Sequence, residues 1–126
     1  MSEVRYPDLR RYVINAVAAL SDLQYQQRVW IERNNPRENY YDDLDTNIHT
    51  LYDDYRILPE PESALDDILV DGDEVERLRT LGRVLGPIID ELGDAPDTQY
   101  LSHPNWPAVI RAAGTSLSAL VLAGGL

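Results

Sequence analysis

The sequence predicts an all-α protein, a compact single-domain helical bundle of about five to six helices that spans residues 1–126. Apolar residues recur at helical spacing through most of the chain, and no segment alternates apolar and polar residues as a half-buried strand does. Prolines and glycines fall between the apolar runs, where connections are expected. With 126 residues, 44% of them hydrophobic, the chain can bury one core without disulfides or metal.

Two helices are predicted before residue 34. The first runs from about residue 8 to 20, with Pro7 in its first turn and apolar residues three or four positions apart. The second is capped by Ser21 or Asp22 and ends at Asn34-Asn35-Pro36. Trp30 is expected in the core; the alternative is an aromatic and guanidinium stack of Tyr25, Arg28, Trp30 and Arg33.

Residues 42 to 56 carry the clearest helical pattern. Their apolar and aromatic residues fall on one side of a helix: Leu44, Ile48, Leu51, Tyr52 and Tyr55. The opposite side collects Asp42, Asp45, Thr46, His49 and Asp53, with Asp43 and Asp54 on its flank. The pattern therefore predicts an acidic face that looks out at solvent.

Four helical segments are predicted in the rest of the chain. A short helix is expected from residue 62 to 69 with Leu65 turned inward, and a long one from about 75 to 92. Pro87 should kink or divide the long helix because it lacks a backbone donor. A one-turn helix starts at Asp97, and the last helix starts at Pro107.

The negative charge is concentrated in one part of the chain. The formal net charge is −11, and residues 42 to 76 alone hold thirteen acids and one arginine. Such a local field repels nucleic acid and anionic lipid and attracts basic proteins or cations. Nucleic acid and membranes are therefore not expected as partners.

The charge distribution predicts a binding module that engages a basic partner protein, in an antidote-like, immunity-like or regulatory role. The predicted partner-binding residues are Tyr41, Asp42, Asp43, Asp45, Asp53 and Asp54, extended by the acids up to Glu76. Tyr40, Tyr41 and Trp30 are candidate aromatic anchors.

A divalent metal site is the first alternative. Asp45, His49 and Asp53 are spaced i, i+4, i+8, so a helix places two carboxylates and an imidazole on successive turns. Oxygen and imidazole ligands of this kind bind hard or borderline divalent cations. The metal, as a bound ion or as part of a metal-dependent enzyme, is the only cofactor that the residues suggest.

Two further interpretations stay open. The apolar C-terminal helix could pair with its symmetry mate in a homo-oligomer. The sequence has no glycine-rich phosphate loop, no nucleophile elbow and no cysteine, so no catalytic residue is predicted and an enzyme is only weakly indicated. Arginines interrupt the N-terminal segment, which therefore does not read as a signal peptide, and the expected location is the cytoplasm.

The segments Leu20-Ser21-Asp22, Arg28-Val29-Trp30 and Tyr41-Asp42-Asp43-Leu44-Asp45 carry a resemblance to a known family. Together with Leu51-Tyr52-Asp53-Asp54 and Trp106-Pro107, they make the chain similar over nearly its whole length to a family of small, acidic, uncharacterised actinobacterial proteins. The resemblance implies a free-standing domain. It implies no activity and no functional residues.

Overall fold

The computed structural model describes residues 4–34, 38 and 41–122. Within these ranges the chain is helical and forms no β-strand beyond one isolated bridge between Leu65 and Leu69. The elements are α1 (Pro7–Leu20), α2 (Leu23–Tyr25), η1 (Gln26–Ile31), α3 (Leu44–Ile48), η2 (His49–Asp54), η3 (Pro61–Ala64), α4 (Gly72–Leu92), α5 (Asp97–Leu101) and α6 (Trp106–Leu122). The predicted all-α class is therefore confirmed.

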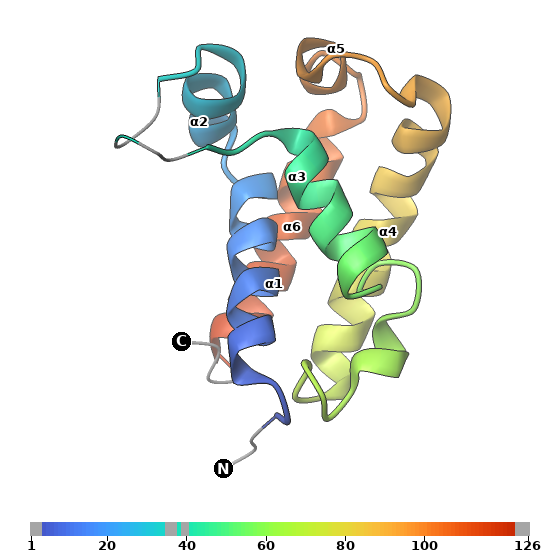
Figure 1. The fold of residues 1–126 in the computed structure, drawn as a ribbon. Coiled ribbons are helices and arrows are strands. Elements are labelled where there is room, and N and C mark those ends of the chain that lie inside the picture. Colours follow the sequence, from blue (N-terminus) through green and yellow to red (C-terminus); the bar gives the residue numbers. More distant parts are fainter. Residues whose placement is uncertain (1–3, 35–37, 39–40, 123–126) are drawn as a thin grey trace.

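Three long helices form the body of the bundle. The last helix, α6, packs against both α4 and α1, and the α3–η2 segment lies across the front of this group (Figure 1). The short helices α2 and α5 lie at one end of the bundle, and the loops around η3 lie at the other. The α3–η2 segment, which carries the predicted acidic face, therefore has one side on the core and one side in solvent.

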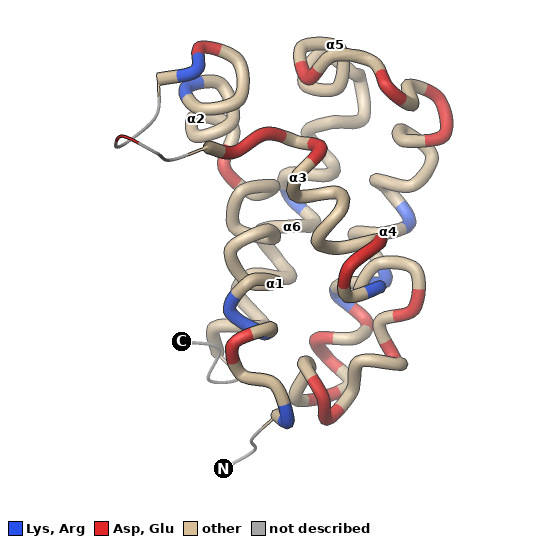
Figure 2. The backbone as a smooth tube through the Cα atoms, viewed as in Figure 1, with Lys and Arg blue, Asp and Glu red and all other residues tan. Residues whose placement is uncertain are grey.

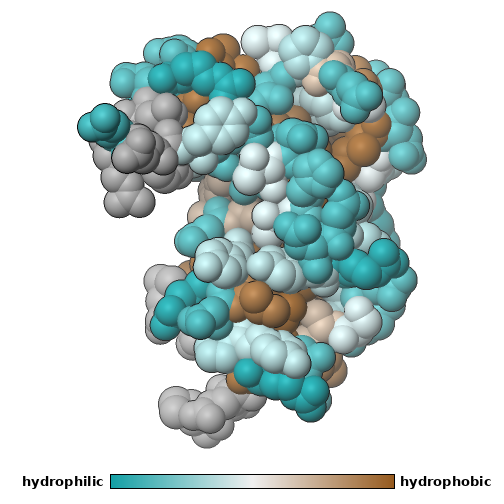
Figure 3. Space-filling view, in the orientation of Figure 1, coloured by the Kyte–Doolittle hydropathy of each residue, from teal (hydrophilic) through white to brown (hydrophobic). Residues whose placement is uncertain are grey.

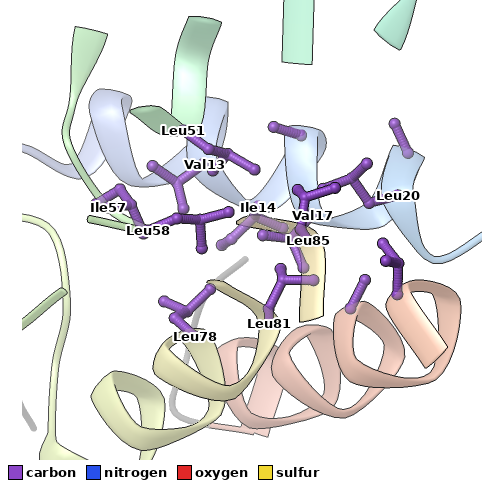
Figure 4. Close-up of a cluster of buried hydrophobic side chains, with 14 of the residues drawn as sticks. Val13, Ile14, Val17, Leu20, Leu51, Ile57, Leu58, Leu78, Leu81 and Leu85 are labelled. Carbon is purple, nitrogen blue, oxygen red and sulfur yellow. The ribbon is translucent and has the colours of Figure 1, made fainter. Parts of the chain in front are cut away.

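Apolar side chains from α1, η2, α4 and the loop after η2 meet in the core (Figure 4). Val13 and Val17 of α1, Leu51 of η2 and Leu81 of α4 are completely buried. Burying one such side chain contributes about 1.5–3 kcal/mol, so this shared core holds the helices together. The stripe predicted for residues 42 to 56 is confirmed, because Leu44 and Leu51 are its most buried members.

The second and third predicted helices each continue into a wider π-helical turn, η1 after α2 and η2 after α3. Asp22 caps α2 by accepting a hydrogen bond from the backbone N–H of Tyr25, as one of the two predicted caps. Both segments end at arginines with a left-handed backbone, Arg33 (φ 59°) and Arg56 (φ 52°). Asn35 and Pro36, which were expected to end the second helix, lie outside the described residues.

The predicted helix from 62 to 69 is wrong. Only Pro61–Ala64 is helical, as a single 3-10 turn, and Leu65 is 40% exposed where it was expected to point inward. The chain turns at Asp66, whose φ is +73°, and the N–H of Asp66 donates to the carbonyl of Leu69. A left-handed residue cannot continue a right-handed helix, so the segment folds back as a loop.

The long helix α4 begins after Asp71, which caps it by accepting from the N–H of Glu74. It ends at Gly93, whose φ is 52°. The helix runs through Pro87 without dividing. Pro87 has no N–H to donate to the carbonyl of Arg83 four residues earlier. Both residues lie on the exposed side of the helix, where water can satisfy that carbonyl.

The C-terminal helix α6 uses its apolar side within the chain. Val109, Ala113 and Leu120 are completely buried against neighbouring helices. Among the described residues, Val121 and Leu122 are the large apolar side chains of this helix that remain exposed. No helix in the described part of the chain combines the length and the apolar character that crossing a membrane requires.

Candidate functional site

The α3–η2 segment presents its carboxylates because its other side is fixed in the core. Asp43 caps α3: its side chain accepts a hydrogen bond of 2.8 Å from the N–H of Thr46. With Leu44 and Leu51 buried, the helical period places Asp45, His49 and Asp53 in solvent. The predicted exposed face is confirmed for these three residues.

Asp45, His49 and Asp53 form a ladder on the surface of the helix. The imidazole Nδ1 of His49 lies 2.5 Å from Asp53 and its Nε2 lies 3.5 Å from Asp45. All three side chains are more than half exposed. The imidazole thus stands between the two carboxylates, with one ring nitrogen near each of them.

This ladder gives the metal hypothesis no geometric support. A metal ion needs ligand atoms that converge on one point, usually from more than one element. In the parts of the chain that the structure describes, no group of three or more His, Asp or Glu side chains is placed to hold a metal ion. A metal site at Asp45, His49 and Asp53 would need the ring and both carboxylates to rearrange.

Asp42 does not stand on the solvent face, contrary to expectation. It precedes α3, is half-buried, and its carboxylate accepts hydrogen bonds from Trp30 Nε1 (2.8 Å), the Tyr25 hydroxyl (2.8 Å) and Asn47 Nδ2 (3.0 and 3.1 Å). These three neutral donors, two from the α2–η1 segment and one from α3, hold the Asp42 carboxylate inward. The helical pattern missed this because those donors come from residues outside the stripe.

Of the expected aromatic anchors, only Tyr41 is on the surface. It is 63% exposed, its hydroxyl donates to Asp43, and its ring lies 5.5 Å from the guanidinium of Arg33. Trp30 is 1% exposed and belongs to the core, where the first of the two predicted arrangements placed it. Tyr40 lies outside the described residues.

The acids that follow η2 are mostly neutralised by arginines within the chain. Arg56 binds Glu60, Arg79 binds Glu62 and Glu76, and Arg77 binds Asp73. The two remaining pairs are Arg5 with Asp67 and the buried pair of Arg10 with Glu74. Basic and acidic positions accordingly lie together between η2 and the first turns of α4 (Figure 2). The predicted extension of the acidic face as far as Glu76 therefore does not form a uniformly negative surface.

A second set of carboxylates lies beside α3 instead. Asp94, from the connection between α4 and α5, and Asp97, the first residue of α5, line a hollow of about 280 Å³ together with Asp45. Asp97 Oδ2 accepts a hydrogen bond of 3.1 Å from the N–H of Leu44, the first residue of α3. Sequence reasoning missed these two residues because they are about fifty positions away in the chain.

The electrostatics of this hollow show that its carboxylates act on one another. Burial raises the pKa of Asp97, the neighbouring Asp43 and Asp45 raise it further, and Arg33 and the Leu44 N–H oppose the shift. Burial also raises the pKa of the Tyr100 hydroxyl, with Asp94, Asp45 and Asp97 adding to the effect. A net negative potential therefore persists here in spite of Arg33.

We call the carboxylates of this region the α3 acidic surface: the exposed Asp45, Asp53, Asp54 and Asp94, and the partly buried Asp97. None of them forms an ion pair with an arginine in the described parts of the chain. Such a surface can attract and orient a cationic partner.

A comparison with known protein families gives a match over nearly the whole chain. Residues 4–125 match a family described as a "Domain of unknown function (DUF7945)". No curated protein and no solved structure matches the chain.

Proposed function

We propose that this chain, which belongs to the DUF7945 family, is a module that binds a basic protein through the α3 acidic surface. The description of the family names no activity, so the proposal rests on the residues of the chain itself. The partner would be a basic protein that this module masks, as an antidote or immunity protein does, or one that it regulates. The cytoplasm is the proposed setting.

One observation carries this proposal: ion pairing divides the acidic part of the chain into two regions. The acids between Glu60 and Glu76 are largely matched by arginines, whereas Asp45, Asp53 and Asp54 form no ion pair with any arginine that the structure describes. Paired surface charges add little to a long-range field, while unmatched charges of one sign sum over the surface. The region that would steer a basic partner is therefore α3–η2 and not the whole acidic segment.

The shape of the region supports the same conclusion. The hollow beside Asp45 is lined by Leu44, Ile48 and Ala95 as well as by carboxylates. An arginine or lysine side chain can lay its apolar stem along such residues while its charged head meets carboxylates. Tyr41, which is exposed, adds an aromatic ring at the edge of the same segment.

A pair of matched variants tests the proposal. The first replaces Asp45, Asp53 and Asp54 with Asn; the second replaces the arginine-paired Glu60, Glu62 and Glu76 with Gln. Both remove the same formal charge from exposed positions. We expect wild-type protein to capture a basic partner from a lysate, the second variant to retain it, and the first to lose it, with about tenfold slower association at low salt.

The outcomes separate specific recognition from net charge. Equal loss in both variants would mean that the partner responds to total charge alone. Full retention by the Asp45, Asp53 and Asp54 variant would refute the proposal. Binding that does not weaken between low and physiological salt would also count against it, since exposed charges are screened over about 8 Å at physiological ionic strength.

A further inference from the structure

A cavity of about 600 Å³ lies on another side of the bundle, between α1, the residues around α2 and the α3–η2 segment. It is lined by Tyr12, Asn15, Ala16, Ala18, Ala19, Tyr25, Asp42, Asn47, Thr50 and Tyr55. The surface is hollowed between the upper and lower parts of the molecule on the α1 side (Figure 3). Three alanines within about one turn of α1, Ala16, Ala18 and Ala19, leave this space, which falls in the size range of small-molecule sites.

The cavity contains a carboxylate without a cationic partner. Asp42 lines it, and no basic side chain in the described residues forms an ion pair with Asp42. Its Oδ2 accepts hydrogen bonds from Tyr25, Trp30 and Asn47, whereas its Oδ1 accepts from Asn47 alone. A carboxylate has about four acceptor sites, and Asn47 Nδ2 shares its two hydrogens among both oxygens and the carbonyl of Asp43, so Oδ1 retains capacity for one further donor.

The donors that hold Asp42 also orient it. Trp30 is almost completely buried and Asn47 is buried, so the carboxylate is fixed by rigid neighbours before any ligand arrives. A site that is ordered in advance loses little entropy on binding. This arrangement differs from the α3 acidic surface, where Asp45, Asp53 and Asp54 are exposed to solvent.

The rest of the lining is apolar or aromatic. The methyl groups of Ala16 and Ala19 offer apolar contact, and the phenol rings of Tyr12, Tyr25 and Tyr55 border the cavity. Burial raises the pKa of Tyr55, and the nearby Asp54 and Tyr12 add to the shift, so its hydroxyl stays neutral. Aromatic rings attract cations, and a carboxylate among them favours a cation that also has an apolar body.

We propose that this cavity binds a small organic cation, an amine with a short apolar or aromatic body, whose charged nitrogen donates to Oδ1 of Asp42. The body of the ligand lies against the α1 alanines and the tyrosine rings. This site is independent of the proposed basic partner, because it uses none of the carboxylates of the α3 acidic surface.

The two tryptophans provide the test. The indole N–H of Trp30 donates to Asp42, while that of Trp106 donates to the buried Gln26, and neither Trp106 nor Gln26 lines the cavity. In ¹H–¹⁵N spectra, benzylamine should therefore shift the Trp30 indole resonance in a saturable way and leave Trp106 unchanged. Benzyl alcohol, which has the same body without the charge, should bind at least about tenfold more weakly, because a charge-assisted hydrogen bond is lost.

Two variants locate the binding. Asp42→Asn removes the charge, and Ala18→Leu fills the cavity without touching the donors of Asp42; each should weaken benzylamine at least about tenfold. Glu62→Gln, which removes an exposed charge outside the cavity, should leave the affinity unchanged. If Asp42→Asn does not fold, Ala18→Leu decides the question.

Any of the following results would overturn the inference. The first is equal binding of benzyl alcohol, which would indicate an apolar cavity only. The second is unchanged benzylamine binding in folded Asp42→Asn or Ala18→Leu. The absence of any shift of the Trp30 indole resonance at about 20 mM benzylamine, which would saturate a site with a Kd of ~1 mM, would equally rule out the proposal. The third is tighter binding of N-acetyl-lysine amide than of benzylamine, which would assign the cavity to a partner's side chain.

Discussion

Arg10 of α1 and Glu74 of α4 form a buried, bidentate ion pair, with Nη1 2.9 Å from Oε1 and Nη2 2.6 Å from Oε2. The remaining contacts of Arg10 go to the carbonyls of Ile68 and Leu120, and Glu74 also accepts from the N–H of Val70. One pair thus joins α1, the loop before α4, the start of α4 and the end of α6.

Replacement of one partner should destabilise the fold strongly. Glu74→Gln leaves the buried Arg10 charge without a counterion, so we expect about 3–5 kcal/mol less free energy of unfolding. The double variant Arg10→Met, Glu74→Leu should lose less than the sum of the two single variants, because it buries no charge. Urea unfolding measures both. The exposed pair Arg11–Asp8 is the control, and its removal should cost no more than about 1 kcal/mol.

Two helical glycines should respond in opposite directions to alanine. A Cβ on Gly82 of α4 would lie 3.1 Å from the carbonyl oxygen of Leu58, which belongs to the backbone and yields little. We expect Gly82→Ala to destabilise by about 1 kcal/mol or more. Gly114 of α6 has nothing within 4 Å of the added carbon, so Gly114→Ala should stabilise by about 0.5–1 kcal/mol. A lower thermal midpoint for Gly114→Ala would contradict the packing around α6.

The stability of the protein should fall at alkaline pH because of Tyr52. Burial, with the nearby Asp90 adding to it, raises the pKa of Tyr52 from 10.0 to about 12. The folded state therefore keeps a proton that the unfolded chain releases near pH 10, so stability is full below pH 10 and is lost as pH rises towards 12.

Tyrosinate absorbance and unfolding experiments over this range test the assignment. Tyr52→Phe should remove the last-titrating component and lessen the alkaline loss. The substitution should have little effect at neutral pH, since the buried Tyr52 hydroxyl has no hydrogen-bond partner in the structure. A Phe variant as sensitive as wild type would show that another group is responsible.

The cap of α3 should contribute to stability at neutral pH and lose its effect in acid. Burial opposes ionisation of Asp43, but the hydrogen bonds from Tyr41 and Thr46 together outweigh it and lower its pKa below 3.8. A lowered pKa stabilises the fold above the unfolded value, and this stabilisation disappears as pH falls through the folded value. We expect Asp43→Ala to cost about 1 kcal/mol at neutral pH and less in strong acid, by urea unfolding. An equal cost at both pH values would argue against the cap.

Features that depend on neighbouring residues were predictable from the sequence. Pro7 lies in the first turn of α1 as predicted, and Asp22 caps α2 as one of the two predicted caps. The stripe through Leu44 and Leu51 gave both the helix and its exposed face, because one helical period determines which side is buried. These predictions needed only local spacing.

Features that depend on contacts between distant segments were not predictable. Arg10 and Glu74 are 64 positions apart, and nothing in the spacing of either marks it as buried. Asp42 turns inward because Tyr25 and Trp30 reach it from another helix. The helical pattern from 62 to 69 gave no sign that Asp66 would take a left-handed backbone. The same limit applies to Asp94 and Asp97, which complete the hollow beside Asp45.

The contact between Arg10 and the carbonyl of Leu120 has a practical consequence for attaching the protein to other molecules. It ties the beginning of α1 to the end of α6, so both lie at the same pole of the bundle, away from α2 and α5 (Figure 1). A tether, a fluorescent protein or a solid support fused to either end would therefore project from that pole. The opposite pole would stay open for capture experiments or for display.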